Sequence, residues 1–176
     1  MASFVGQGSG KSKLQLQRLF DSESPLAEQL PTGLGFANAR QVTFGSEIGG
    51  VGFPYHLEAN GDLTILERDN YSLTVSLRFD RAGSSQVSEL WFYIFVDGVQ
   101  AGRSISYDFD KAGETHYLDF STLRDIPSGT LIQVFIARDL NNSHNSGGLY
   151  RKNSSEPSLL NSAPCAQLRL DRFLNI

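Results

Sequence analysis

Residues 70–80 alternate apolar and polar side chains without an exception. Apolar residues stand at every odd position, from Tyr71 to Phe79, and polar residues stand at every even position. Because successive side chains of a β-strand point to opposite faces, this alternation predicts a strand with one apolar and one polar face. Segments of the same kind follow one another along the chain, separated by Gly, Asn, Asp and Ser. The pattern therefore predicts an all-β sandwich.

The other expected strands are placed by turn residues and by apolar runs. Asn60-Gly61 is a strong hairpin signal between strands at 55–58 and 62–66. Residues 90–96 are apolar throughout, which predicts a strand covered on both faces. Further strands are expected at 41–45, 99–106, 115–120, 131–138 and 166–173.

Composition restricts the classes of protein that the chain can belong to. The 176 residues, 40% of them hydrophobic and 11% aromatic, suffice for one domain with a packed core. Cys165 is the single cysteine, so the fold does not rely on a disulfide, which fits synthesis in a reducing cytoplasm. The net charge of −4 argues against direct nucleic-acid binding, and we expect neither a signal peptide nor a membrane segment.

Residues 1–40 differ in composition from the rest. Glycine and serine at 6–12 indicate flexible chain, and Ser24-Pro25 predicts a short helix near 25–30. We expect this segment to be an extended N-terminal arm that lies across another subunit, beside a body at 41–176 with a long polar loop at 139–164. The apolar residues expected to bind a partner are Phe4, Val5, Leu14, Leu16, Leu19, Phe20, Leu26 and Leu30.

Aromatic residues are more numerous than one sandwich core requires. In the strand at 90–96, Trp91, Tyr93 and Phe95 share one face. If the opposite face fills the core, these three rings need cover from a sister subunit, the arm or the long loop. The aromatic residues can be explained by core filling or by an oligomer interface. Both explanations stay open, and the composition favours the interface. The interface candidates are Tyr71, Phe79, Trp91, Tyr93, Phe95, Tyr117 and Phe173.

The order of these segments resembles a known family. The hairpin strand at 63–66, the strand that opens with Asn70-Tyr71, the run at 90–96 and the phrase at 129–134 resemble tumour-necrosis-factor-like domains. The resemblance implies an antiparallel two-sheet jelly-roll sandwich that forms a homotrimer. Together with the arm, the pattern is similar to decoration or cement proteins of tailed bacteriophages. That similarity implies a place on the capsid surface and binding to the major capsid protein.

Catalytic and metal motifs are incomplete. The Gly10-Lys11 pair lacks the glycine that a phosphate-binding loop needs five residues earlier, where Val5 stands. The acidic turn at 108–119 comes near a calcium loop, but Ala112 occupies a ligand position. The three histidines, His56, His116 and His144, include no pair spaced to hold a metal on one strand. We therefore expect no enzymatic activity, no metal and no cofactor, and calcium at the acidic turn stays open.

Three functions are carried forward. The first is a structural virion protein that decorates and stabilises the head through its arm and its oligomeric jelly roll. The second is a receptor- or glycan-binding head of a phage fibre or tail, with Asn141, His144 and Tyr150 in the long loop as contacts. The third is an enzyme, which would require activity that depends on His116.

Overall fold

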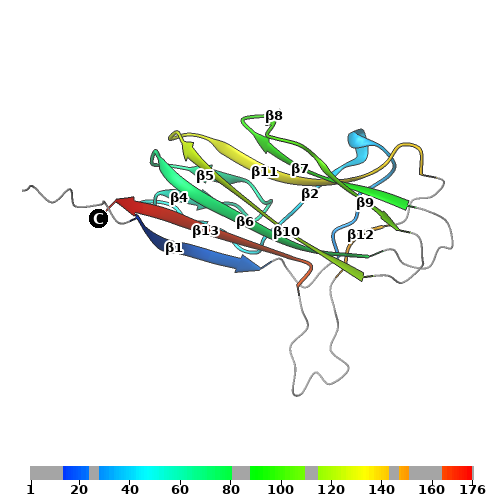
Figure 1. The fold of residues 1–176 in the computed structure, drawn as a ribbon, viewed down its shortest axis with the longest axis horizontal. Helices are drawn as coiled ribbons and strands as arrows, with labels where there is room; N and C mark the ends of the chain where they lie inside the picture. Colours follow the sequence, from blue (N-terminus) through cyan, green and yellow to red (C-terminus); the bar gives the residue numbers. More distant parts are fainter. Residues whose placement is uncertain are drawn as a thin grey trace, which may run out of the picture.

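Strands account for most of the computed structural model, which describes residues 14–23, 28–80, 88–109, 115–142, 147–150 and 164–175. Within these ranges the strands form two antiparallel sheets that pack face to face (Figure 1). The fold is the antiparallel jelly-roll sandwich that we expected. The helical structure in the described ranges is one 3-10 turn, η1 (Phe36–Asn38), and no described helix is long and apolar enough to cross a membrane.

The first sheet has the order β1-β13-β6-β10, with β12 pairing to β6. Its strands are β1 (Leu14–Glu23), β6 (Asp69–Asp80), β10 (Thr115–Ile126), β12 (Gly148–Leu149) and β13 (Ala166–Asn175).

The second sheet has the order β3-β4-β5-β11-β7-β8, with β2 pairing to β11 and β9 pairing to β7. Its strands are β2 (Arg40–Gln41), β3 (Ile48–Gly49), β4 (Tyr55–Leu57), β5 (Leu63–Ile65), β7 (Ser88–Val96), β8 (Val99–Gln100), β9 (Ile105–Phe109) and β11 (Leu131–Arg138).

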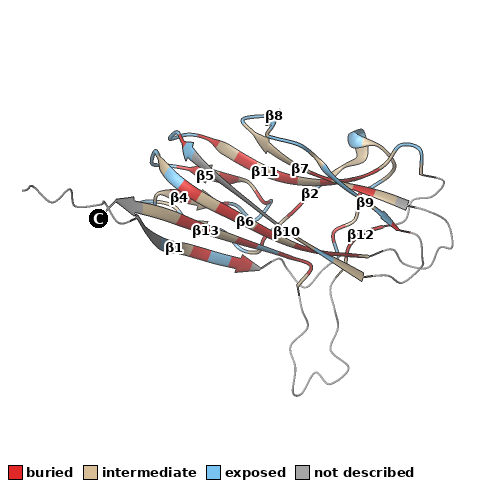
Figure 2. Cartoon of the chain, viewed as in Figure 1, coloured by how far each residue is buried: buried red, intermediate tan, exposed pale blue. Residues whose placement is uncertain are grey.

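The alternating segment forms β6, in the middle of the first sheet. Its five apolar side chains, from Tyr71 to Phe79, are each at most 2% exposed. Antiparallel neighbours β13 and β10 flank it. Figure 2 shows buried residues recurring along β6, β11 and β13. The prediction of a strand with one apolar face is confirmed, because that face meets the second sheet.

The hairpin predicted at Asn60-Gly61 is also confirmed. It joins β4 to β5, with Leu57 opposite Leu63. Gly61 has φ +96°, and a Cβ atom there would lie 2.1 Å from the carbonyl oxygen of Val42. Glycine is therefore required at this position both by the backbone conformation and by the close approach of the neighbouring chain.

The described residues of the predicted arm belong to the sandwich, which corrects our expectation for them. β1 pairs with β13 from Leu14 opposite Asn175 to Glu23 opposite Gln167. Phe20 is 7% exposed, and its ring centroid lies 4.5 Å from that of Tyr55. Pairing of this kind satisfies backbone groups that β13 would otherwise expose at the sheet edge.

The other predicted arm residues have different outcomes. Leu19 and Leu30 are partly buried in the same chain. Leu14 and Leu16 contribute their backbones to β1. Phe4, Val5 and Leu26 lie outside the described residues.

The short helix predicted near 25–30 is wrong for residues 28–30. The backbone N–H and C=O of Gln29 pair with those of Leu149 in an isolated bridge, each at 3.0 Å. The side-chain amide of Gln29 in turn bonds both backbone groups of Thr43. These contacts hold the segment extended.

The long loop expected at 139–164 is not continuous, since the short strand β12 lies within it. Residues 143–146 and 151–163 lie outside the described residues.

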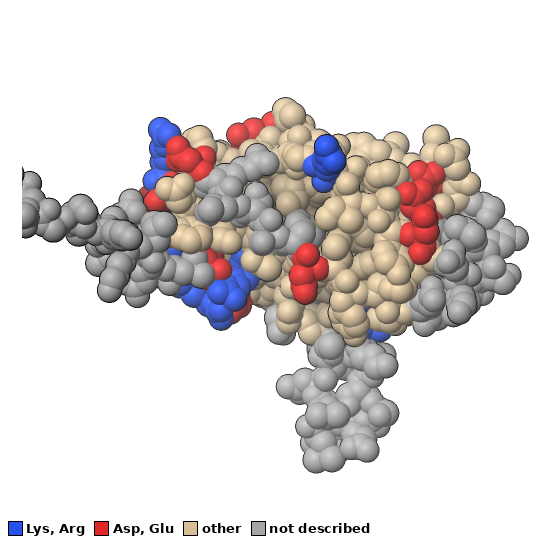
Figure 3. Space-filling view, viewed as in Figure 1, with Lys and Arg blue, Asp and Glu red and all other residues tan. Residues whose placement is uncertain are grey.

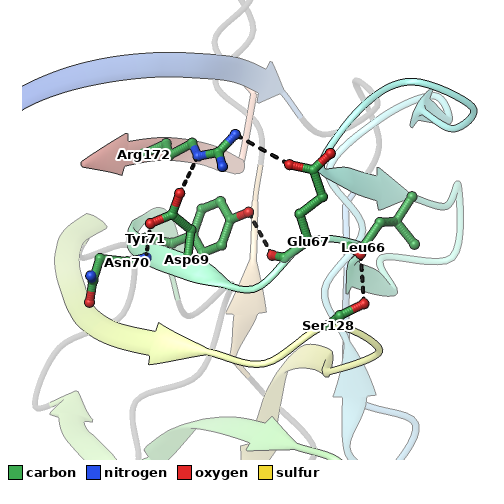
Figure 4. A network of polar contacts seen from close by, with 7 residues as sticks. All are labelled: Leu66, Glu67, Asp69, Asn70, Tyr71, Ser128 and Arg172. Atoms are coloured by element: carbon green, nitrogen blue, oxygen red, sulfur yellow. Dashed lines mark hydrogen bonds and ion pairs between the residues drawn. The ribbon is translucent and has the colours of Figure 1, made fainter. Parts of the chain in front are cut away.

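A polar network ties the C-terminal strand to the start of β6 (Figure 4). The guanidinium of Arg172 bonds the carboxylate of Asp69 and lies 3.4 Å from that of Glu67. The hydroxyl of Tyr71 donates to the backbone carbonyl of Glu67 at 2.8 Å. Away from such clusters, the face shown in Figure 3 carries small, separate charged groups on a largely uncharged surface.

Candidate functional site

A group of aromatic rings lies on the outer side of the second sheet. Side chains of β7 alternate, so that Leu90 and Phe92 are at most 2% exposed in the core, while Trp91, Tyr93 and Phe95 are half-buried on the opposite face. We call the outward rings the aromatic face. Its members are Phe36, Trp91, Tyr93, Phe95 and Phe135.

The rings of the aromatic face pack directly against one another. The Phe36 ring centroid lies 5.6 Å from those of Tyr93 and Phe95 and 6.4 Å from that of Phe135. Phe95 and Phe135 are 5.4 Å apart in an edge-to-face arrangement. Trp91 extends the row, 6.5 Å from Tyr93. These distances lie in the range in which aromatic pairs attract each other beyond simple burial.

Phe36 reaches this position because of the turn before it. Gly35 has φ +76°, and its N–H donates to the carbonyl of Arg138 at 2.9 Å. The turn leads into η1 and lays the Phe36 ring over β7 and β11, where 53% of Phe36 remains exposed. The segment predicted as the arm thus covers part of the aromatic face within the same chain, and the cover is incomplete.

Polar groups border the aromatic face. At one end, the indole N–H of Trp91 donates to the carboxylate of Asp139 at 3.0 Å. At the other end, the carboxylate of Asp62 accepts hydrogen bonds from the amides of Gln41, Gln133 and Asn60 at 2.7, 2.7 and 2.9 Å. An apolar, aromatic centre with a polar rim is the anatomy of protein interfaces.

The pKa of the Asp62 carboxyl is lower than its ordinary value of 3.8. Partial burial acts to raise this pKa, but the hydrogen bonds from Gln133, Gln41 and Asn60 together outweigh it. The pKa of Asp62 is lower in the folded state than in the unfolded state. The ionised carboxylate therefore stabilises the fold fully at pH values above the unfolded pKa. This contribution disappears as the pH falls through the folded pKa.

We therefore expect the substitution Gln133→Leu to raise the pKa of Asp62, because it removes one donor to the ionised form. Carboxyl chemical shifts followed by NMR between pH 7 and 2 measure this directly. In parallel, Asp62→Asn should reduce the loss of stability on acidification below about pH 4, measured by urea unfolding at pH 7 and pH 3. A wild-type Asp62 pKa at or above 3.8 would contradict the account.

Two of the predicted interface residues are not on the surface. Tyr71 and Phe79 are 0% and 1% exposed in the core, because both lie on the inward face of β6. That expectation is corrected. Tyr117 on β10 is 73% exposed, and Phe173 on β13 is half-buried; both belong to the first sheet, away from the aromatic face.

The structure adds two residues to the aromatic face that sequence reasoning missed. Phe135 stands opposite Tyr93 in the pairing of β11 with β7. The mixed burial along β11 has the same two-residue period, so its sequence pattern contained a signal for an outward Phe135. Phe36 had no such signal, since it lies in a short turn far from β7 in sequence.

The predicted ligand-loop residues occupy separate positions. Asn141 is exposed after β11, and its N–H donates to the carboxylate of Asp139 at 2.7 Å. Tyr150 follows β12, where its backbone carbonyl accepts a hydrogen bond from the guanidinium of Arg78. His144 lies outside the described residues.

The two described histidines, His56 and His116, lie in different surroundings. His116 packs among core rings, with the Tyr107 hydroxyl oxygen 2.6 Å from its Nδ1 atom and the Phe79 ring centroid 5.9 Å away. His56 on β4 lies 3.2 Å from the carboxylate of Glu47. Among the described residues, no three His, Cys, Asp or Glu side chains are grouped to hold a metal ion. Residues 110–114 of the acidic turn lie outside the described ranges.

No protein-family model matches the chain, and no curated protein matches it. Any functional assignment therefore depends on the geometry of this chain and on the pattern of its strands.

Proposed function

We propose that the chain is a structural subunit of a bacteriophage virion, a decoration or cement protein on the exterior of the capsid. Its jelly-roll sandwich associates with other copies, as a homotrimer, and with the major capsid protein. The observation that carries the association is the aromatic face, an incompletely covered group of five rings on one sheet. The assignment to a virion comes from the similarity of a tumour-necrosis-factor-like strand pattern, combined with an N-terminal arm, to phage decoration proteins, and residues 14–23 of that arm pair within the sandwich.

The physical basis for association is the burial of exposed apolar surface. Phe36 is 53% exposed, and Leu140, which borders the same hollow beside Trp91, is 72% exposed. Large exposed apolar patches mark interaction sites, and aromatic rings dominate the binding energy of interfaces. We first gave the attachment role to the N-terminal arm at 1–40. Since β1, which is part of that segment, belongs to the sandwich, we give this role to the aromatic face.

The proposal predicts that Phe36→Asp prevents self-association without unfolding the chain. Burying an unpaired carboxylate among rings is costly, so the dissociation constant should rise at least about thirtyfold, the value for loss of an interface hot spot. Phe53→Asp is the matched control, because Phe53 is 52% exposed but stands at another place, next to Tyr55. Sedimentation velocity over a concentration series measures both variants.

The same pair of variants tests attachment to the capsid. Shells assembled from the major capsid protein of the same genome should sediment with the wild-type chain and with Phe53→Asp, but not with Phe36→Asp. Interfaces of millimolar affinity begin to form at about 100 μM. The proposal would be refuted if the wild-type chain stayed monomeric at this concentration and did not bind shells.

A groove on the other sheet favours the second candidate function, a glycan-binding head. Ser76, Tyr117, Asp119 and Gln167 line a hollow of about 380 Å³ on the outer side of the first sheet. An exposed ring beside hydroxyl, carboxylate and amide groups is suited to stacking on a sugar and bonding its hydroxyls. Binding of the wild-type chain to a glycan array, competed by the free sugar, would favour this function over the first.

A further inference from the structure

A cavity of about 380 Å³ lies between the two sheets. Its apolar lining comes from both sheets and consists of Leu73, Ile94, Val96, Ile105, Ile126 and Ile132. Protein interiors are close-packed, with few voids larger than a water molecule. The volume of this cavity falls within the range of about 300–1,000 Å³ that is typical of small-molecule pockets.

The rim of the cavity carries three charged side chains. Asp125 is bound by the guanidinium of Arg68, with Nε 3.0 Å from Oδ1, and this contact lowers the pKa of Asp125. The carboxylate of Asp97 accepts the backbone N–H of Leu131 at 2.8 Å. Arg103 is exposed, and no described residue forms a hydrogen bond or ion pair with its guanidinium.

We propose that this cavity binds a small amphiphile with an anionic head group, of the class of medium-chain carboxylates. The alkyl chain lies between the sheets, and the carboxylate meets Arg103 at the rim. Apolar cavities of about 150 Å³ already accept small apolar ligands in proteins. Arg103 supplies the charge that pairs with a carboxylate, because it is the one cation among the three rim side chains, and the guanidinium of Arg68 neutralises Asp125. This binding is independent of the proposed association through the aromatic face.

The first test is a chain-length and head-group series, measured by isothermal titration below the micellar concentration. From hexanoate to octanoate to decanoate, affinity should rise about fourfold for each added methylene, as expected for burial of an alkyl chain. Decylammonium should bind more weakly than decanoate. Equal or tighter binding of decylammonium would overturn the assignment of the head group, and the absence of binding by every member would overturn the site.

The second test fills the cavity. Val96→Phe places a ring in the void and should abolish decanoate binding. Val99→Phe is the matched control, because Val99 on β8 is 70% exposed and does not line the cavity. Thermal melting followed by circular dichroism checks the fold of both variants, and a ring that enters a true void leaves the melting temperature unchanged or raises it. Decanoate binding that survives in a folded Val96→Phe variant would overturn the proposal.

The third test addresses the head group and needs no change in the core. Arg103→Gln should weaken decanoate binding by up to about fivefold, the upper end of the range for loss of an ion pair at a solvent-exposed site, and should leave decanol binding unchanged. Arg40→Gln, at another exposed arginine, should change neither. An equal loss for decanoate and decanol, or no loss for decanoate, would overturn the role of Arg103. Because this variant alters only an exposed side chain, it decides the question even if Val96→Phe fails to fold.

Discussion

Removal of residues 1–23 will strongly destabilise the protein, although those residues have the composition of a dispensable arm. The deletion removes β1 and leaves the backbone groups of β13 exposed at the sheet edge, where they invite aggregation. It also removes Phe20 from the core and the hydroxyl of Ser22, which donates to the carbonyl of Phe44. Loss of a buried phenylalanine alone costs about 3–5 kcal/mol. That is a large share of the about 5–15 kcal/mol that stabilises a typical domain.

Urea unfolding and size-exclusion chromatography test this expectation. Deletion of residues 1–13, which ends just before the first residue of β1, is the comparison. Within the full-length chain, Phe20→Ala should cost about 3–5 kcal/mol, whereas Gln17→Ala, at an exposed position of the same strand, should change stability by less than about 0.5 kcal/mol. A soluble chain lacking residues 1–23 with an unchanged urea midpoint would show that β1 does not belong to the sandwich.

The substitution Phe79→Ala is expected to unfold the subunit rather than to dissociate an oligomer. Phe79 is 1% exposed at the centre of a ring cluster. Its ring centroid lies 4.9 Å from Phe92, 5.2 Å from Tyr107 and 5.7 Å from Phe109. Truncation leaves a cavity that this packed cluster cannot close, so the free energy of unfolding should fall by about 3–5 kcal/mol.

Tyr117→Ala is the control for this substitution. Tyr117 is also aromatic and lies on the neighbouring strand β10, but it is 73% exposed. Its removal should change stability by less than about 0.5 kcal/mol. Urea unfolding at several protein concentrations distinguishes the two effects, since loss of core packing is independent of concentration. If Phe79→Ala kept its subunit stability and only dissociated an assembly, Phe79 would be an interface residue as its sequence context first indicated.

Local patterns predicted those parts of the fold that depend on neighbours in sequence. The two-residue alternation in β6 determines which side chains face inward, because the pleat of a strand leaves no other choice. The Asn60-Gly61 hairpin depends on the backbone freedom of one glycine. Both predictions are confirmed for this physical reason.

The role of residues 14–23 was missed because their pattern is interrupted. The register of β1 against β13 shifts between Arg18 and Phe20, as at a β-bulge. Such an irregularity breaks the alternation from which a strand is predicted. The partner strand is also the last one in the chain, and pairing over such a separation has no local signature in the sequence.

The sequence by itself determined the all-β class, the inward face of β6 and the grouping of Trp91, Tyr93 and Phe95 on one side of a strand. Only the tertiary structure decided that this side is the outer one, because a wholly apolar strand contains no polar residue to mark the face toward water. The tertiary structure alone also brought Phe36 and Phe135 onto the aromatic face and left a cavity between the sheets. Both results depend on how distant strands pair and pack, and the hydrophobic effect that drives this packing is not directional.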